Sequence, residues 1–280
     1  MRVLVSALMI AMLVVPWCCS LPGNAGGLHE DLYAGWDSAL HKYVNGKGEV
    51  NYRDWKTDRQ SLDSFLQAAS EVTAGDCAQM SKNEKLALWI NLYNAFTAKQ
   101  VLDHYPIQRS GFNLYPTSSI RQIDGVWDKY RVACCGRNVT LSEIENKILR
   151  GEFGEPLIHF AINCASHSCP KLMNRAYKGP TLEKDLNEAS RAFVTDPTRN
   201  RIDVRSRKVE LSKIFDWFGD DFKARYSAPA LSGRSAKESA VINFVLANVQ
   251  GSDKELISSN KFSLGYLPYD WSLNEQGAGH

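Results

Sequence analysis

The sequence predicts an α+β fold: a mostly helical single domain with a small sheet. Apolar residues recur at spacings of three and four in several segments, which is the pattern of amphipathic helices. Two capping boxes, Ser81 to Glu84 and Thr140 to Glu143, mark helix starts. Stretches with strand character are few, short and scattered. Many helices with a few strands at scattered places are typical of the α+β class.

In the first half, helices are expected over Leu28–Val44 and around Leu62–Ala69, and a short strand near Val50. The helix that begins after Ser81 is apolar nearly all round as far as Leu102, so it is predicted to lie inside the domain. Asn91 and Asn94 fall within this helix. Because a buried amide is costly when unpaired, each is expected to make a specific hydrogen bond. That bond either ties a neighbouring loop or orients a catalytic group or substrate.

In the second half, the short apolar run Leu157–Ile162, bounded by Pro156, predicts a buried strand. The remaining elements follow from their spacing and caps. We expect a helix after Thr140, a helix from Thr181 to Asp196, a hairpin of residues 201–204 and 208–211, a helix after Ser212, a helix over Ala236–Val249, and a strand within residues 262–273.

The length and charge of the chain limit the classes of function to be considered. The 280 residues, 44% of them hydrophobic, are enough for one sizeable core. Lys and Arg number 33 against 31 Asp and Glu, and no long basic run occurs. Nucleic acid is therefore a poor candidate partner, and we expect none.

The N-terminus predicts export. Arg2 precedes the apolar run Val3–Trp17, which has the length of a signal peptide and is too short to span a membrane comfortably. Small residues favour cleavage after Ala25, which gives a signal peptide of residues 1–25 and a single domain of residues 26–280; cleavage after Ser20 is the alternative. Cys18 and Cys19 raise the alternative of a lipid anchor, which the bulky residues before them disfavour. We expect a periplasmic or secreted protein with no transmembrane helix in the mature chain.

Five cysteines remain after this cleavage: Cys77, Cys134, Cys135, Cys164 and Cys169. An exported chain meets an oxidising environment, which permits disulfides, and an odd number leaves at least one thiol unpaired. Adjacent cysteines do not readily bridge each other. The simplest pairing joins Cys77 to Cys134 or Cys135, and Cys164 to Cys169.

The segment Ile158–Pro170 combines burial with reactive side chains more densely than any other. A nucleophilic cysteine needs a nearby base, and the base needs an orienting partner. Cys164 and His159 are the candidates. Their odd spacing on a strand puts them on opposite faces unless the chain bends at Asn163 or Cys164. A core role for His159 and a Cys164–Cys169 disulfide are the competing interpretations; Glu143, Glu145, Asn91 and Asn94 are the candidate orienting residues.

The sequence gives less support for a metal site or a cofactor site. His159, Cys164, His167 and Cys169 are acceptable zinc ligands, but their spacing is not that of a zinc finger or ribbon. No HExxH motif, phosphate-binding glycine loop, dinucleotide fingerprint or GxSxG elbow occurs. We therefore expect no metal and no cofactor.

Several motifs, in order along the chain, resemble those of the domain-of-unknown-function 547 family over about Leu28–Asn274. They are the segments 88–95, 141–145 with 148–150, 159–161 with 163–166 and 168–170, 176–177, 211–215 and 269–274. The family occurs in exported bacterial proteins and in plant proteins. Its helix followed by a histidine-bearing strand is similar to a remote papain- or transglutaminase-like arrangement, an analogy at the level of fold only.

The resemblance assigns family motif positions to six residues: Asn91, Asn94, Glu145, His159, Cys164 and Cys169. Asn146 departs from the pattern, because the family often has histidine after the glutamate, and this puts a mechanism based on Glu145 and that histidine in doubt here. His167, Cys134 and Cys135 lie outside the pattern.

The sequence thus leads to two hypotheses. In the first, the protein is a hydrolase or transferase that acts on an amide or ester of a small molecule or peptide in the cell envelope. Cys164 is then the nucleophile and His159 the base or electrostatic partner. In the second, it is a non-catalytic envelope-binding or structural domain with a Cys164–Cys169 disulfide.

Overall fold

A computed structural model describes residues 32–111 and 113–277 of the chain. The predicted signal peptide, residues 1–25, lies outside the described residues. The fold is α+β and mostly helical, as predicted. The α-helices are α2 (Ala34–Tyr43), α3 (Tyr52–Thr57), α4 (Gln60–Glu71), α5 (Ala74–Gln79), α6 (Lys82–His104), α7 (Leu141–Glu143), α8 (Leu182–Val194), α9 (Lys213–Phe218), α10 (Lys223–Tyr226), α11 (Ala236–Asn248) and α12 (Gly251–Ser259).

The remaining elements are short. A π-helix, η2 (Ile144–Phe153), follows α7 directly, and the 3-10 helices are η1 (Ile120–Gln122), η3 (Pro156–Phe160), η4 (Gly179–Thr181) and η5 (Gly219–Phe222). Strands β1 (Val132–Cys134) and β2 (Arg137–Val139) form one antiparallel hairpin. Strands β3 (Arg201–Asp203), β4 (Lys208–Leu211) and β5 (Ser263–Tyr266) form a three-stranded sheet in which β5 pairs with β4 in parallel.

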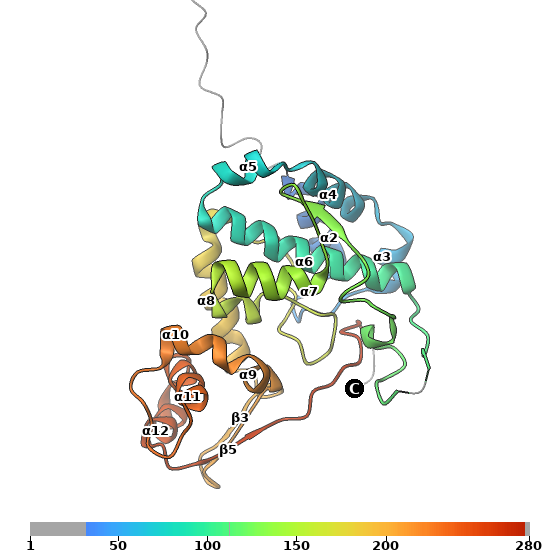
Figure 1. Cartoon of the computed structure of the whole chain (residues 1–280). Coiled ribbons are helices and arrows are strands. Elements are labelled where there is room, and N and C mark those ends of the chain that lie inside the picture. The colour runs from blue at the N-terminus through green and yellow to red at the C-terminus, as the bar shows by residue number, and fades with distance from the viewer. Residues whose placement is uncertain (1–31, 112, 278–280) are drawn as a thin grey trace, which may run out of the picture.

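Helix α6 is the centre of the fold. Figure 1 shows it between the group α2 to α4 and the π-helix η2. Its capping box at Ser81 and Glu84 is formed, and its side chains from Leu86 to Val101 are buried almost without interruption. This confirms the prediction of an interior helix, since only a helix covered on all sides can bury residues around its whole circumference. One continuous hydrophobic core runs from Tyr33 to Leu273.

The C-terminal segment brings distant parts of the chain together. After β5 it runs back toward the centre of the molecule (Figure 1). There it forms isolated bridges from Leu273 to Ser166 and from Glu275 to Val50. The tail therefore lies directly against the segment 163–170. The expected strand near Val50 is reduced to these isolated bridges.

The predicted strand Leu157–Ile162 is wrong. Residues 156–160 form the 3-10 helix η3, with Pro156 in its first turn and the Glu155 side chain accepting a hydrogen bond from the Leu157 amide. A short apolar run has no periodicity that separates a buried strand from one buried helical turn. The proposed likeness to papain or transglutaminase depended on a histidine-bearing strand, so it loses its basis.

One disulfide joins Cys77 to Cys135 and ties helix α5 to the β1–β2 turn. It agrees with the predicted pairing of Cys77 with one of the two adjacent cysteines. Cys134 is left as a buried free thiol, and burial raises its pKa to about 12. Within the described ranges, no helix is long and apolar enough to cross a membrane.

Candidate functional site

A cavity of about 390 Å³ lies where η2, η3, α9 and the C-terminal segment meet. Its walls combine thiols, a histidine, a carboxylate, a guanidinium and several aromatic rings. The lining residues are Tyr93, Arg121, Trp127, Ser142, Glu145, Asn146, His159, Ile162, Cys164, Cys169, Pro170, Ile214, Trp217, Phe218, Tyr269 and Trp271. A partly apolar concavity with a few convergent polar groups is the usual form of a small-molecule or catalytic site.

The loop that carries Cys164 is fixed by buried amides. Asn94 on α6 donates from Nδ2 to the Ala161 carbonyl (2.9 Å) and accepts at Oδ1 from the Asn163 amide (2.8 Å). The Asn163 side chain in turn donates to the Pro170 carbonyl and accepts from the Ala165 amide, both at 2.7 Å. These bonds hold the backbone on both sides of Cys164, which lines the cavity.

Asn91 plays a similar part elsewhere. It accepts from the Tyr177 amide (3.0 Å) and donates to the Tyr177 carbonyl (2.7 Å). Both asparagines therefore make the specific hydrogen bonds expected of them. Neither lines the cavity, so their amides position backbone rather than contact a substrate.

The two thiols of this loop lie against each other. Cys164 Sγ is 2.6 Å from Cys169 Sγ, closer than two non-bonded sulfur atoms normally approach. The sulfur of Cys169 also accepts from the Cys164 amide (3.1 Å) and the Ser166 hydroxyl (3.2 Å), and it lies 3.2 Å from the Tyr269 hydroxyl. Cys164 is the more accessible of the two, and Cys169 is buried.

This arrangement shifts the pKa values of the two thiols in opposite directions. Burial alone raises the pKa of Cys169, but hydrogen bonds from Cys164, Ser166 and Tyr269 outweigh it and lower that pKa to about 6. The hydrogen bond to Cys169, followed by burial, raises the pKa of Cys164 well above its ordinary value. The pair therefore loses one proton easily and the second with difficulty, and the first negative charge resides mainly on Cys169.

His159 lies on η3 and reaches the same cavity from another wall. Its Nε2 is 2.7 Å from Asp221 Oδ2, its side chain is 2% exposed, and its ring stacks on Phe218 at a centroid separation of 4.2 Å. Both Cys164 and His159 are in the described residues, and no hydrogen bond joins them. The histidine thus has an orienting carboxylate, and it lines the same cavity as Cys164.

Sequence reasoning missed Asp221. This carboxylate lies on η5 and also receives two hydrogen bonds from Arg150, Nε at 2.6 Å and Nη2 at 2.9 Å. Partial burial would raise its pKa, but the hydrogen bonds from His159 and Arg150 hold it well below the ordinary value. Asp221 stands 62 residues from His159, and no local spacing links them.

Glu145 lines the cavity on the π-helix η2 and accepts from the Tyr93 hydroxyl (2.9 Å). Asn146 beside it donates to the Ser142 carbonyl (3.0 Å) and accepts from Arg150 (2.7 Å). Asn146 and Arg150 stand four residues apart, close to one turn, so they lie on the same face of the helix. Asn146 is therefore occupied in holding Arg150, the partner of Asp221.

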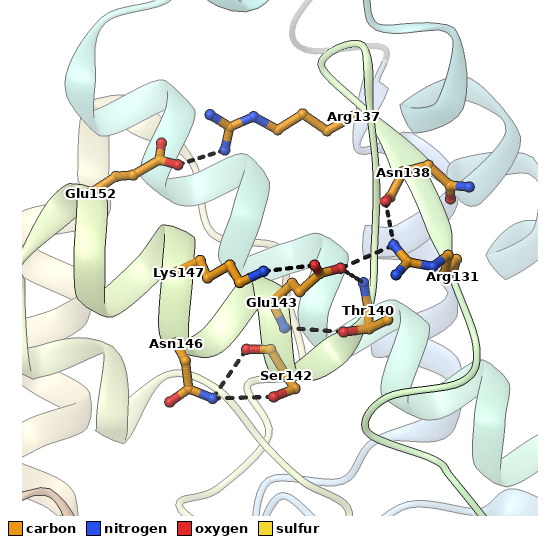
Figure 2. A network of polar contacts seen from close by, with 9 residues as sticks. All are labelled: Arg131, Arg137, Asn138, Thr140, Ser142, Glu143, Asn146, Lys147 and Glu152. Atoms are coloured by element: carbon orange, nitrogen blue, oxygen red, sulfur yellow. Dashed lines mark hydrogen bonds and ion pairs between the residues drawn. The ribbon is translucent and has the colours of Figure 1, made fainter.

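Glu143, the other candidate orienting residue, serves a different purpose. Figure 2 shows its carboxylate bound to the Thr140 amide, Lys147 and Arg131. The Lys147 hydrogen bond is the main reason that its pKa falls to about 2. Glu143 caps the helix and joins it to the β1–β2 hairpin, and it does not line the cavity.

Aromatic side chains form the outer wall. The Trp217 and Trp271 rings stack at 5.9 Å, and Tyr269 lies 4.8 Å and 4.6 Å from them. Arg121 places its guanidinium over Trp271 at 4.0 Å and over Tyr115 at 4.9 Å. A second hollow, lined by Leu114, Tyr115, Pro116 and Asp270, adjoins the cavity through Tyr269 and Trp271.

The zinc hypothesis has no geometric support. In the part of the chain that the structure describes, no three His, Cys, Asp or Glu side chains are arranged to hold a metal ion. His167, whose amide donates to the Ser272 carbonyl, is not among the residues that line the cavity.

Comparison with protein-family models gave a match over part of the chain. Neither the curated proteins nor the solved structures gave a match. The matching family model, described as "Protein of unknown function, DUF547", covers residues 77–194, a narrower span than the resemblance in the sequence. That span holds His159, Cys164 and Glu145, whereas Asp221 and the aromatic wall at Trp217 and Trp271 lie beyond it. Over residues 77–194, this chain is therefore similar to the DUF547 family.

Proposed function

We propose that this protein is an exported thiol-dependent hydrolase or transferase that acts on an amide or ester of a small molecule or peptide. One observation carries the proposal. The same cavity holds Cys164, whose sulfur is paired with Cys169, and His159, whose ring is held by Asp221. A nucleophile, a proton-transfer group and an orienter of that group are the minimum set for acyl transfer.

In the proposed mechanism, Cys164 Sγ attacks the substrate carbonyl carbon and passes its proton to the sulfur of Cys169. The carbon–nitrogen or carbon–oxygen bond then breaks, and the leaving group takes a proton from the protonated His159, which Asp221 stabilises. Water or an acceptor nucleophile then attacks the thioester carbon and gives its proton to His159. The carbon–sulfur bond breaks, and Cys164 takes back the proton held by Cys169, which restores the starting state. A substrate bond placed between the thiol and the ring explains why these groups share a cavity without touching.

A second candidate is a non-catalytic envelope-binding or structural domain in which Cys164 and Cys169 form a disulfide. The short separation of their sulfur atoms, 2.6 Å, favours it. An oxidised Cys164 cannot act as a resting nucleophile. The two candidates therefore differ in the oxidation state of one sulfur atom.

The test is turnover of chromogenic esters and amides, such as 4-nitrophenyl acetate, followed by intact-mass detection of the acyl-enzyme. Cys164→Ser is expected to abolish acylation and to lower turnover by a factor on the order of 100 or more. Cys134→Ala is the matched control, since this buried thiol lies outside the cavity. Turnover that survives in Cys164→Ser, or acylation at another residue, would exclude the mechanism.

A further inference from the structure

The outer part of the cavity has the features of a ligand-binding site, and its residues have no role in the proposed thiol mechanism. It contains the stacked Arg121, the rings of Trp217 and Trp271, and the adjoining hollow at Leu114. We infer that this region binds a carboxylate-bearing ligand with an apolar body, such as an N-acylated amino acid or the acidic end of a short peptide. The inference rests on the proposed function only in treating this ligand as the substrate.

The first observation is the state of Arg121. Among the described residues its guanidinium has no carboxylate partner, while both Trp271 and Tyr115 lie within 5 Å of it. Stacking on rings uses the face of the guanidinium and leaves the N–H donors at its edge available. It also fixes the side chain, so less conformational entropy is lost when an anion binds in the bidentate geometry.

The second observation is where apolar surface is exposed. Three large hydrophobic side chains are exposed in the described residues: Leu114, Val204 and Trp217. Two of them, Leu114 and Trp217, line this cavity or its adjoining hollow. Exposed apolar side chains gathered at a concave site indicate a surface that an apolar partner covers.

The third observation selects a carboxylate over a phosphate. Arg150, the other nearby guanidinium, is already bound in a bidentate pair to Asp221. The cavity also contains the Glu145 carboxylate. Asp270 adds a second carboxylate in the adjoining hollow. One available guanidinium near these carboxylates suits a singly charged anion, since a dianion would be repelled by them and left with half its charge unpaired.

The extended outline of the site fits this ligand. The cavity and the hollow share Tyr269 and Trp271, and Arg121 stacks between the rings of Tyr115 and Trp271 at their junction. When a ligand carboxylate is bound to Arg121, the rest of the ligand can extend through the cavity toward the thiols or through the hollow toward Leu114. An acyl-amino acid can therefore place its amide near Cys164 while its apolar side chain lies on Trp217.

The test measures binding without chemistry, in the full mature chain carrying Cys164→Ser. The probes are N-acetyl-L-phenylalanine, its neutral analogue N-acetyl-L-phenylalaninamide, and phenyl phosphate, followed by quenching of tryptophan fluorescence and by ligand-observed NMR. The carboxylate is expected to bind at least about tenfold more tightly than the amide. Arg121→Gln should remove that difference, and Arg121→Lys should restore part of it.

Arg205→Gln is the matched control, because Arg205 is an exposed arginine in the β3–β4 turn and does not line the cavity. Trp217→Ala should weaken the acid and the amide alike. Equal affinity for the acid and the amide, tighter binding of phenyl phosphate, or absence of binding at millimolar concentration would each overturn the inference. Because binding is measured without turnover, its failure is separate from a failure of the thiol mechanism.

Discussion

The imidazole Nε2 of His159 lies 2.7 Å from the Asp221 carboxylate, and Arg150 holds the same carboxylate through two further hydrogen bonds. The three side chains come from η3, η5 and the π-helix η2. Packing of these elements therefore fixes the orientation of the one histidine that lines the cavity. The relationship gives His159 the partner that acid–base catalysis needs and that the sequence alone did not reveal.

Asp221→Asn is expected to lower turnover by a factor on the order of 100, because the amide keeps the shape but loses the charge that supports protonated His159. It should also cost about 2 kcal/mol in the free energy of unfolding, since Arg150 and His159 lose their common acceptor. Turnover assays and urea denaturation measure the two effects. Asp220→Asn is the control, because this neighbouring carboxylate is exposed and forms its ion pair with Lys223, away from His159 and Arg150.

The stabilisation by Asp221 should depend on pH in a defined direction. Its pKa is lower in the folded protein than in the unfolded chain, so the stabilising contribution is complete above the unfolded value of about 4. It is lost as pH falls below that value toward the folded-state pKa. The difference in stability between wild type and Asp221→Asn should therefore narrow below about pH 4. A constant difference across that range would contradict the ion-pair assignment.

Tyr269→Phe should make the thiol pair less acidic, because the Tyr269 hydroxyl is one of the groups that lowers the pKa of Cys169. In the reduced protein, the pH midpoint for alkylation by iodoacetamide is expected to rise by about 1 unit. Tyr266→Phe, a change of the same size on β5, should leave it unchanged. An unchanged midpoint in Tyr269→Phe would show that the hydroxyl does not support the thiolate.

Asn94→Ala should destabilise the protein by about 2–4 kcal/mol, because it leaves a buried carbonyl at Ala161 and a buried amide at Asn163 without partners. Chemical denaturation measures the loss. Asn83→Ala in the exposed first turn of the same helix is the control and should change stability by less than about 1 kcal/mol. A fall in turnover without loss of stability would instead assign Asn94 a direct catalytic role.

The sequence was informative where the signal is local. The capping boxes at Ser81 and Thr140, the apolar circumference of α6 and the β3–β4 hairpin each follow from residues close together in the chain, and the structure confirms them. The bend inferred between His159 and Cys164 depended on the alternation of side chains along a strand, and His159 lies on the 3-10 helix η3 instead, so that inference loses its basis.

The rest depends on tertiary contacts. The run Leu157–Ile162 is compatible with a buried strand and with a buried helical turn. In the folded protein, residues 156–160 of this region form the 3-10 helix η3. Asp221 lies 62 residues from His159 in the sequence, and the packing of η5 brings the two together. Tyr269 lies 105 residues from Cys164, and the return of the C-terminal segment brings it to the thiol. Neither the apolar run after Pro156 nor the local sequence around Asp221 indicates that these two segments contact each other in the fold.

The oxidation state of Cys164 in the purified protein tests the proposed thiol mechanism most directly. The measurement is alkylation with iodoacetamide at pH 7 without prior reduction, followed by peptide mass spectrometry. The proposed function predicts that Cys164 and Cys169 are both reduced and that the pair takes up label, together with a Cys77–Cys135 linked peptide and a Cys134 that reacts only after unfolding. A quantitative Cys164–Cys169 disulfide, with a loss of about 2–4 kcal/mol in stability for Cys169→Ser, would contradict it.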